Sequence, residues 1–152
     1  MISKWLDFDP FASRIVKIAG IIIILDNKEF LLCHQTNSKS LSFPKGRVDK
    51  GESEIDAAIR ELKEETSIDI NSSMITNPKS PIVIQYKNKN KFRNLYLYTV
   101  YIKDISEIGL STKTIPVENL PLSEINWVGF MSKEESQKNL SKNVTSLIHL
   151  LK

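Results

Sequence analysis

The sequence predicts an α/β domain in which a mixed sheet is covered by one helix from the middle of the chain and one from its C-terminal end. Three observations favour this class. A nearly continuous β-branched run occupies residues 16–25, a helical period follows at residues 55–66, and the elements come in the order strands, helix, strands, helix. A long apolar run is typical of a strand buried on both faces, as in sheets that carry helices on each side.

Apolar segments bounded by turns predict the strands. The run at residues 16–25 turns at residues 26–28 and returns as a second strand at residues 30–34, which makes a hairpin. Residues 41–44 are expected to be extended, because Pro44 disfavours a helix before it. Further strands are predicted at the following ranges: 82–84, 95–102 and 125–128, with a hairpin turn at 87–91 between the first two.

Apolar spacing predicts the helices. The core-facing stripe of the middle helix falls at i, i+3, i+4, i+7 and i+11, on Ile55, Ala58, Ile59, Leu62 and Thr66. Ser132 followed by Glu135 fits a capping box that opens another helix. A last helix is predicted from the same spacing, on Val144, Leu147, Ile148 and Leu151.

Length and composition favour one globular domain spanning residues 1–152. Hydrophobic residues make up 41% of the 152 residues and charged residues 26%, and a formal charge of +3 says little about partners. The lone Cys33 excludes an internal disulfide framework and fits a reducing compartment, where we expect it to be buried and inert. The longest apolar run, residues 18–25, is far shorter than the roughly 20 residues that span a bilayer. We therefore expect a cytoplasmic protein with no membrane partner.

Three glutamates on the middle helix suggest chemistry. Glu61, Glu64 and Glu65 stand at i, i+3 and i+4, so their side chains are neighbours on a flank roughly 120° from the apolar stripe. Like charges at this spacing destabilise an isolated helix by a few tenths of a kcal/mol per pair. The alternatives are a solvated acidic face, partly neutralised by Arg60 and Lys63, or a site for a hard cation such as Mg²⁺.

The residues before these glutamates favour the cation site. Gly46 is followed by five residues and Glu52, then by seven residues and Arg60-Glu61, and Glu64-Glu65 precede Ser67 and Ile68. This pattern over residues 46–68 resembles the Nudix box of the Nudix hydrolase family, with Ser67 in place of the usual glycine. A residue just after a helix often adopts positive φ, where serine is less stable than glycine by about 1 kcal/mol. The departure is therefore expected to affect stability and to leave the chemistry intact.

The resemblance implies an α/β/α sandwich fold and a metal-dependent pyrophosphohydrolase. It implies that Glu61, Glu64 and Glu65 bind Mg²⁺, with Mn²⁺ as a substitute, and that the carbonyl of Gly46 adds a ligand. Arg60 would orient the carboxylates and pair with Glu52, which would lock the loop to the helix. Glu64 is the first candidate for the general base, and two later glutamates, Glu118 and Glu124, are alternatives that also fit ordinary surface positions.

Basic residues surround the acidic box. Lys45, Arg47 and Lys50 flank the loop, and alternating residues of the predicted hairpin, Lys87, Lys89, Lys91 and Arg93, are expected to share one face. Such a ridge could hold a polyphosphate, or its lysines could protect a sheet edge. Tyr86 lies where some Nudix dinucleoside polyphosphate hydrolases carry a tyrosine that could stack on a base, or it is an ordinary sheet residue.

The favoured substrates are small phosphorylated molecules, namely dinucleoside polyphosphates or diphosphoinositol polyphosphates. Phe43-Pro44-Lys45-Gly46 resembles the approach to the box in hydrolases of both substrates and in mRNA-decapping enzymes. Decapping enzymes add a helical domain, whereas only a short segment precedes the first predicted strand here, so RNA is a less favoured partner. A catalytically inactive Nudix-fold module that binds a nucleotide or RNA is the alternative from another class.

Three further expectations concern residues outside the box. His34 and His149 have no partner at metal-ligand spacing and are predicted to be structural. Trp5, Phe8 and Phe11 are predicted to pack an N-terminal arm onto the domain, where a dimer contact would be compatible with the sequence. The oligomeric state is left open between a monomer and a homodimer.

Overall fold

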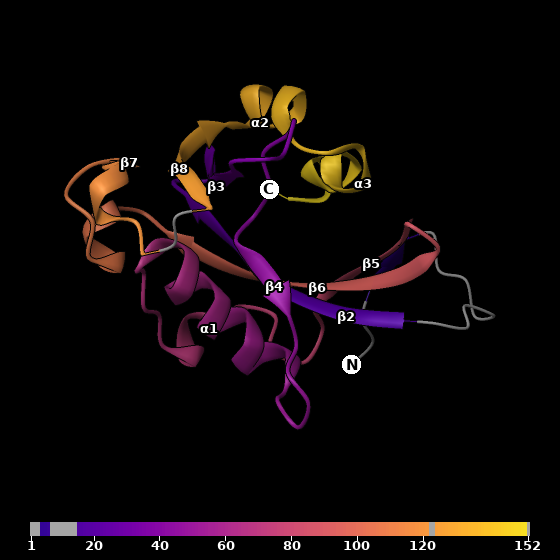
Figure 1. Cartoon of the computed structure of the whole chain (residues 1–152). Helices are drawn as coiled ribbons and strands as arrows, with labels where there is room; N and C mark the ends of the chain where they lie inside the picture. The colour runs from indigo at the N-terminus through magenta and orange to yellow at the C-terminus, as the bar shows by residue number, and fades with distance from the viewer. Residues whose placement is uncertain (1–3, 7–14, 122–123, 152) are drawn as a thin grey trace.

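A computed structural model describes residues 4–6, 15–121 and 124–151, and Figure 1 shows an α/β architecture. The strands are β1 (Lys4–Leu6), β2 (Ile15–Leu25), β3 (Glu29–Gln35), β4 (Lys45–Arg47), β5 (Ile82–Asn88), β6 (Lys91–Ile102), β7 (Thr114–Ile115) and β8 (Ile125–Ser132). The α-helices are α1 (Glu54–Thr66), α2 (Lys133–Asn139) and α3 (Lys142–Thr145). Short 3₁₀ helices are η1 (Ser72–Met74), η2 (Ile105–Ile108), η3 (Val117–Asn119) and η4 (Ser146–Leu150).

The described strands form one mixed sheet in the order β1-β5-β6-β2-β3-β8-β7, with β4 paired to β2. β2 runs parallel to β6 along its whole length, from the pair Ile15–Phe92 to the pair Leu25–Ile102. The predicted hairpin of β2 and β3 is present, but it keeps only two residue pairs before β3 leaves to pair with β8. β4 occupies the edge that β3 leaves, opposite residues 18–20 of β2.

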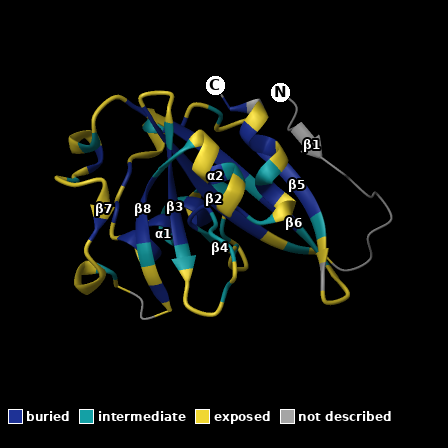
Figure 2. Cartoon of the chain, turned by 90° about the horizontal axis from the view of Figure 1, so that it is seen from above, coloured by how far each residue is buried: buried dark blue, intermediate teal, exposed yellow. Residues whose placement is uncertain are grey.

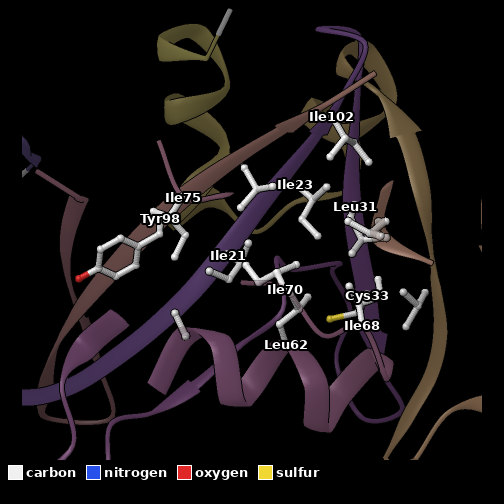
Figure 3. Close-up of a cluster of buried hydrophobic side chains, with 14 of the residues drawn as sticks. Ile21, Ile23, Leu31, Cys33, Leu62, Ile68, Ile70, Ile75, Tyr98 and Ile102 are labelled. Atoms are coloured by element: carbon white, nitrogen blue, oxygen red, sulfur yellow. The ribbon is translucent and has the colours of Figure 1, made fainter. Parts of the chain in front are cut away.

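Helices cover both faces of the sheet, which confirms the predicted α/β class (Figures 1 and 2). Alternate residues of β2 supply two cores, so that Ile21 and Ile23 belong to the α1 side, and Ile22 and Ile24 to the α2–α3 side. All four are buried, which explains the uninterrupted apolar run. Figure 3 shows the first core, where Leu62 of α1 lies beneath the sheet. Complete burial of such a side chain contributes about 1.5–3 kcal/mol.

The C-terminal part differs from the sequence prediction in detail. Ser132 caps α2 as expected, because its side chain accepts a hydrogen bond from the backbone N–H of Glu135. The last helix is not continuous, however, and consists of α3 followed by the 3₁₀ turn η4. Its predicted apolar positions, Val144, Leu147, Ile148 and Leu151, are all buried in the second core.

The predicted N-terminal arm is described at one of its three aromatic residues. Phe8 and Phe11 lie outside the described residues, whereas Trp5 lies in β1, which runs parallel to β5 at the sheet edge. In the described part of the chain, no helix combines the length and apolarity needed to cross a membrane.

α1 begins and ends at identifiable caps. The Ser53 side chain accepts a hydrogen bond from the backbone N–H of Asp56, which fixes the N-terminus one residue before the predicted apolar stripe starts. Ser67 is the C-cap with φ of 67°, in the left-handed region, and its N–H donates to the carbonyl of Lys63. The positive φ expected at this position is therefore confirmed.

Replacing Ser67 with glycine should stabilise the protein. Glycine adopts this φ without strain, so Ser67→Gly is expected to raise the free energy of unfolding by about 0.5–1 kcal/mol. Urea denaturation monitored by circular dichroism measures the change. Ser67→Ala retains a Cβ and is the matched control, for which no such gain is expected. Equal stabilities of the glycine and alanine variants would show that strain at φ does not matter here.

Candidate active site on helix α1

The Arg60 guanidinium contacts several carboxylates on and beside the acidic face of α1. Its Nε lies 2.8 Å from Glu52 Oε2, and its Nη1 lies 2.9 Å from an oxygen of Glu61 and 2.9 Å from an oxygen of Glu64. Its Nη2 donates to the carbonyl of Arg47, 2.9 Å away. The contact of Arg60 with Glu52 that the resemblance implied is thus present, and it ties the loop after β4 to the helix.

The backbone of β4 shapes the place of Glu61. The carboxylate of Glu61 lies directly against Gly46, so that a Cβ at residue 46 would overlap its atoms. Only glycine leaves this space free, which gives a physical reason for the glycine of the sequence pattern. Burial raises the pKa of Glu61, and the nearby charge of Glu64 acts in the same direction, although the hydrogen bond from Arg60 opposes both.

Glu65 is buried, which the helical projection alone did not predict. Its side chain turns toward the sheet, where Oε1 accepts from the backbone N–H of Lys45 at 3.1 Å and from the Cys33 thiol at 3.8 Å. Burial raises the pKa of Glu65 to about 7, and the charge of Glu61 adds to the shift. Desolvation disfavours the anion, and the hydrogen bond from the Lys45 backbone and the positive charge of the Lys45 side chain offset it only in part.

Cys33 is buried as predicted, and Figure 3 shows it pointing from β3 toward α1. Burial and the neighbouring Glu65 charge raise the pKa of its thiol to about 12, which keeps it protonated and unreactive. The thiol is not merely an apolar filler, however, because it contacts both Glu65 and the hydroxyl of Ser42.

The three glutamates do not converge as closely as the sequence suggested. Arg60 separates Glu61 from Glu64, and Glu65 turns toward Lys45. Consequently no group of three His, Cys, Asp or Glu side chains within the described ranges is close enough together to hold a metal ion. The i, i+3, i+4 spacing predicted that the three glutamate side chains are neighbours. It did not account for the Arg60 guanidinium and the Lys45 backbone N–H, which donate hydrogen bonds to these carboxylates.

The donor set nevertheless fits a hard divalent cation. The available ligands are carboxylate oxygens, which such cations prefer. The raised pKa values of Glu61 and Glu65, caused chiefly by burial, indicate carboxylates that a nearby cation would stabilise in their charged form.

The predicted basic ridge on the hairpin is wrong in part. The turn at Lys89 and Asn90, both with positive φ, places Tyr86 opposite Arg93 and Lys87 opposite Phe92. Cross-strand partners share a face, so Lys87 and Arg93 lie on opposite faces of the sheet. The Lys87 ammonium lies 6.0 Å from the centre of the Phe92 ring. Lys91 shares the face of Arg93, whereas Lys89 is exposed at the turn.

The face that carries Arg93 contains a pocket of about 270 Å³. Three predicted substrate-binding residues, Lys45, Tyr86 and Arg93, line it together. Tyr86 also packs on the second core, as an ordinary sheet residue does, and its stacking on a base stays a prediction. Arg47 instead borders a separate hollow beside the loop after β4.

The structure places the other candidates as follows. Glu118 and Glu124 are both exposed, and the backbone carbonyl of Glu124 accepts hydrogen bonds from Thr36, so a catalytic role for either remains a prediction.

His34 bridges two segments, because its ring nitrogens lie 2.7 Å from Asn126 Oδ1 and 2.8 Å from the carbonyl of Ser38. His34 is therefore structural, as predicted. One wall of the pocket, formed by Ser38, Ser40 and Ser42, is called the serine-rich wall. It was not recognised in the sequence, because its role depends on the fold.

Comparisons with known proteins agree with this geometry. A family model described as NUDIX domain matches residues 16–142. The mRNA decapping complex subunit 2 of Schizosaccharomyces pombe is 28% identical over 146 residues, which cover 95% of this chain but only 18% of that protein. The RNA pyrophosphohydrolase of Pelagibacter ubique is 32% identical over 121 residues, covering 72% of this chain and 73% of that protein. A crystal structure of C. elegans Ap4A hydrolase superposes with a TM-score of 0.67 at 28% identity, covering 89% of this chain and 94% of that one.

The raised pKa of Glu65 should make the stability of the metal-free protein depend on pH. The folded state holds the proton up to a pKa of about 7, whereas the ordinary pKa of this group is 4.5, so this contribution is complete below about pH 4.5 and is lost as pH rises through 7. Glu65→Gln removes the titration. In EDTA, urea unfolding should show the variant gaining about 1–3 kcal/mol over wild type between pH 5 and pH 7.5. A difference that does not change with pH would contradict this assignment.

Proposed function

The chain belongs to the NUDIX domain family, and from this premise we propose that it hydrolyses a pyrophosphate bond in a polyphosphorylated substrate with the help of a divalent cation. The observation that carries the proposal is the arrangement around Arg60. One guanidinium fixes Glu52, Glu61 and Glu64, while Glu61 lies against the glycine that begins the motif. A solvated acidic face would not require this glycine contact, nor would it explain a buried Glu65.

Nudix hydrolases generally use divalent metal ions, and we infer Mg²⁺ as the resident ion, with Mn²⁺ as a substitute. Glu61, Glu64 and Glu65 would hold it, and the carbonyl of Gly46 is the expected backbone ligand. When bound, such an ion neutralises phosphate oxygens and lowers the pKa of a water molecule.

The chain's own residues have separable roles in this proposal. Arg60 orients Glu61 and Glu64 and offsets their mutual repulsion, and Glu52 anchors the guanidinium. Glu64 is the candidate general base, since its side chain is 43% exposed and can receive a proton from water near the helix. Glu65 is fixed from behind by the backbone of Lys45, which leaves Oε2 without a protein donor among the described residues.

We infer that the substrate is a dinucleoside polyphosphate or a diphosphoinositol polyphosphate. The cationic pocket beside Lys45 supports a substrate with several phosphates, and the similar C. elegans structure is that of an Ap4A hydrolase. The relatives named for mRNA decapping and RNA pyrophosphohydrolysis support a second candidate, hydrolysis at the 5′ end of RNA. The chain spans less than a fifth of the S. pombe decapping subunit, so that subunit's activity is considered only as this candidate.

Replacing Glu64 with glutamine should separate catalysis from binding. Glu64→Gln removes both a ligand charge and the candidate base, so kcat is expected to fall by about 100-fold or more. The assay measures hydrolysis of diadenosine polyphosphates, diphosphoinositol phosphates, ADP-ribose, oxidised nucleotides and capped or triphosphorylated RNA with Mg²⁺ or Mn²⁺. Substrate binding should persist.

Glu134→Gln, on the exposed surface of α2, is the matched control and should retain full activity. Failure of the folded, metal-supplied wild-type protein to hydrolyse any member of this panel would favour the inactive binding module instead. Preference for capped RNA over the free cap dinucleotide would favour the RNA candidate.

A further inference from the structure

The pocket beside Arg93 has an unusual charge pattern. It lies between the sheet and the start of α3. Its lining residues come from the segment between β3 and β4, from the strands β4, β5 and β6, and from the α2–α3 junction. Among the described residues that line it, Lys45 and Arg93 are the charged ones, and both are cations. A pocket that gathers positive charge without a carboxylate is complementary to an anion.

Most polar side chains that line this pocket have no side-chain partner in the part of the chain that the structure describes. No side-chain hydrogen bond or ion pair to the described residues involves the following six: Gln35, Ser40, Lys45, Tyr86, Arg93 and Asn143. Their hydroxyl, amide and cationic groups are therefore available to a ligand. Polar groups that converge on one cavity and remain unpaired are typical of a ligand site.

Arg93 gives the most specific indication that this pocket binds an anionic ligand. Its Nε is buried and lacks a hydrogen-bond partner, and it is the only such side-chain N or O atom found in the described part of the chain. A buried donor without an acceptor costs about 1–3 kcal/mol, and more for a charged group. A guanidinium is well suited to a phosphate, whose oxygens it can bind in pairs.

The serine-rich wall is held in place before any ligand arrives. The Ser38 hydroxyl donates to the carbonyl of Ser40 and accepts from its N–H, at 2.9 and 3.2 Å. His34 holds the carbonyl of Ser38, and Ser38 N–H donates to the carbonyl of Gln35. A wall fixed in this way loses little conformational entropy when it binds a ligand.

Lys45 connects the pocket to the acidic site. Its backbone N–H holds Glu65, whereas the residue also lines the pocket. A substrate whose anhydride lies at the α1 carboxylates can therefore extend past Lys45 toward Arg93. A cavity of about 270 Å³ has room for a phosphorylated group of modest size.

We propose that this pocket binds a phosphate group of the substrate beyond the anhydride that is cleaved, with Arg93 as its principal ligand and Lys45, Ser40 and Asn143 as supporting contacts. The inference rests on the proposed function for the identity of the substrate, but binding in the pocket requires neither a metal ion nor hydrolysis. It makes Arg93 a determinant of specificity for substrates that carry phosphate on both sides of the cleaved bond.

Calorimetry on the metal-free protein in EDTA tests the proposal, with inorganic tripolyphosphate and adenosine as probes at about 0.15 M salt. The wild type should bind tripolyphosphate and should not bind adenosine. Arg93→Gln should weaken the binding at least tenfold. Asn143→Asp, at an exposed position where folding should tolerate the change, places a negative charge at the pocket and should weaken it similarly.

Lys103→Gln removes one positive charge at an exposed position that does not line this pocket, and it should change the affinity less than twofold. Glu61→Gln should abolish turnover and bind metal-free tripolyphosphate at least as tightly as wild type, so the two proposals fail separately. Undetectable tripolyphosphate binding, equal affinity of wild type and Arg93→Gln, or adenosine binding as tight as that of tripolyphosphate would overturn the proposal.

Discussion

The site depends on one guanidinium that lies among several oxygens. Arg60 binds Glu52, Glu61, Glu64 and the carbonyl of Arg47, so it joins the loop after β4 to α1 while neutralising charges that would otherwise repel. Its pKa is raised, chiefly by the hydrogen bond to Glu52, which means that it stays charged at any pH where the protein folds. The acidic face of α1 is therefore a cross-linked arrangement rather than a row of independent surface glutamates.

The departure of β3 from β2 makes this arrangement around Arg60 possible. If β3 followed β2 along its whole length, its side chains would occupy the edge where β4 now approaches α1. Because β3 departs after two pairs, the chain between them can return as β4 and bring Gly46 against Glu61. The same departure leaves room for the serine-rich wall on the other side of the sheet. The topology thus creates one site on each side of a three-residue strand.

Features that depend on local sequence were predictable, and features that depend on register were not. The β-branched run of β2 and the apolar stripe of α1 carry their own periodicity, and the motif identified Arg60 and Glu52 as partners. β4 was missed because three residues in a charged, glycine-containing loop have no strand signal of their own. The faces of Lys87 and Arg93 were misassigned because the two-residue turn sets the register, and the contact of Cys33 with Glu65 joins residues far apart in the chain.

Residue 45 contributes to both sites through different groups, since its peptide amide holds Glu65 and its side chain lines the pocket. Every amino acid except proline supplies that amide. Natural variation at this one position can thus alter which molecules are accepted while the amide contact to Glu65 is kept, and it would act on the acidic cluster only through the charge that Lys45 places near Glu65.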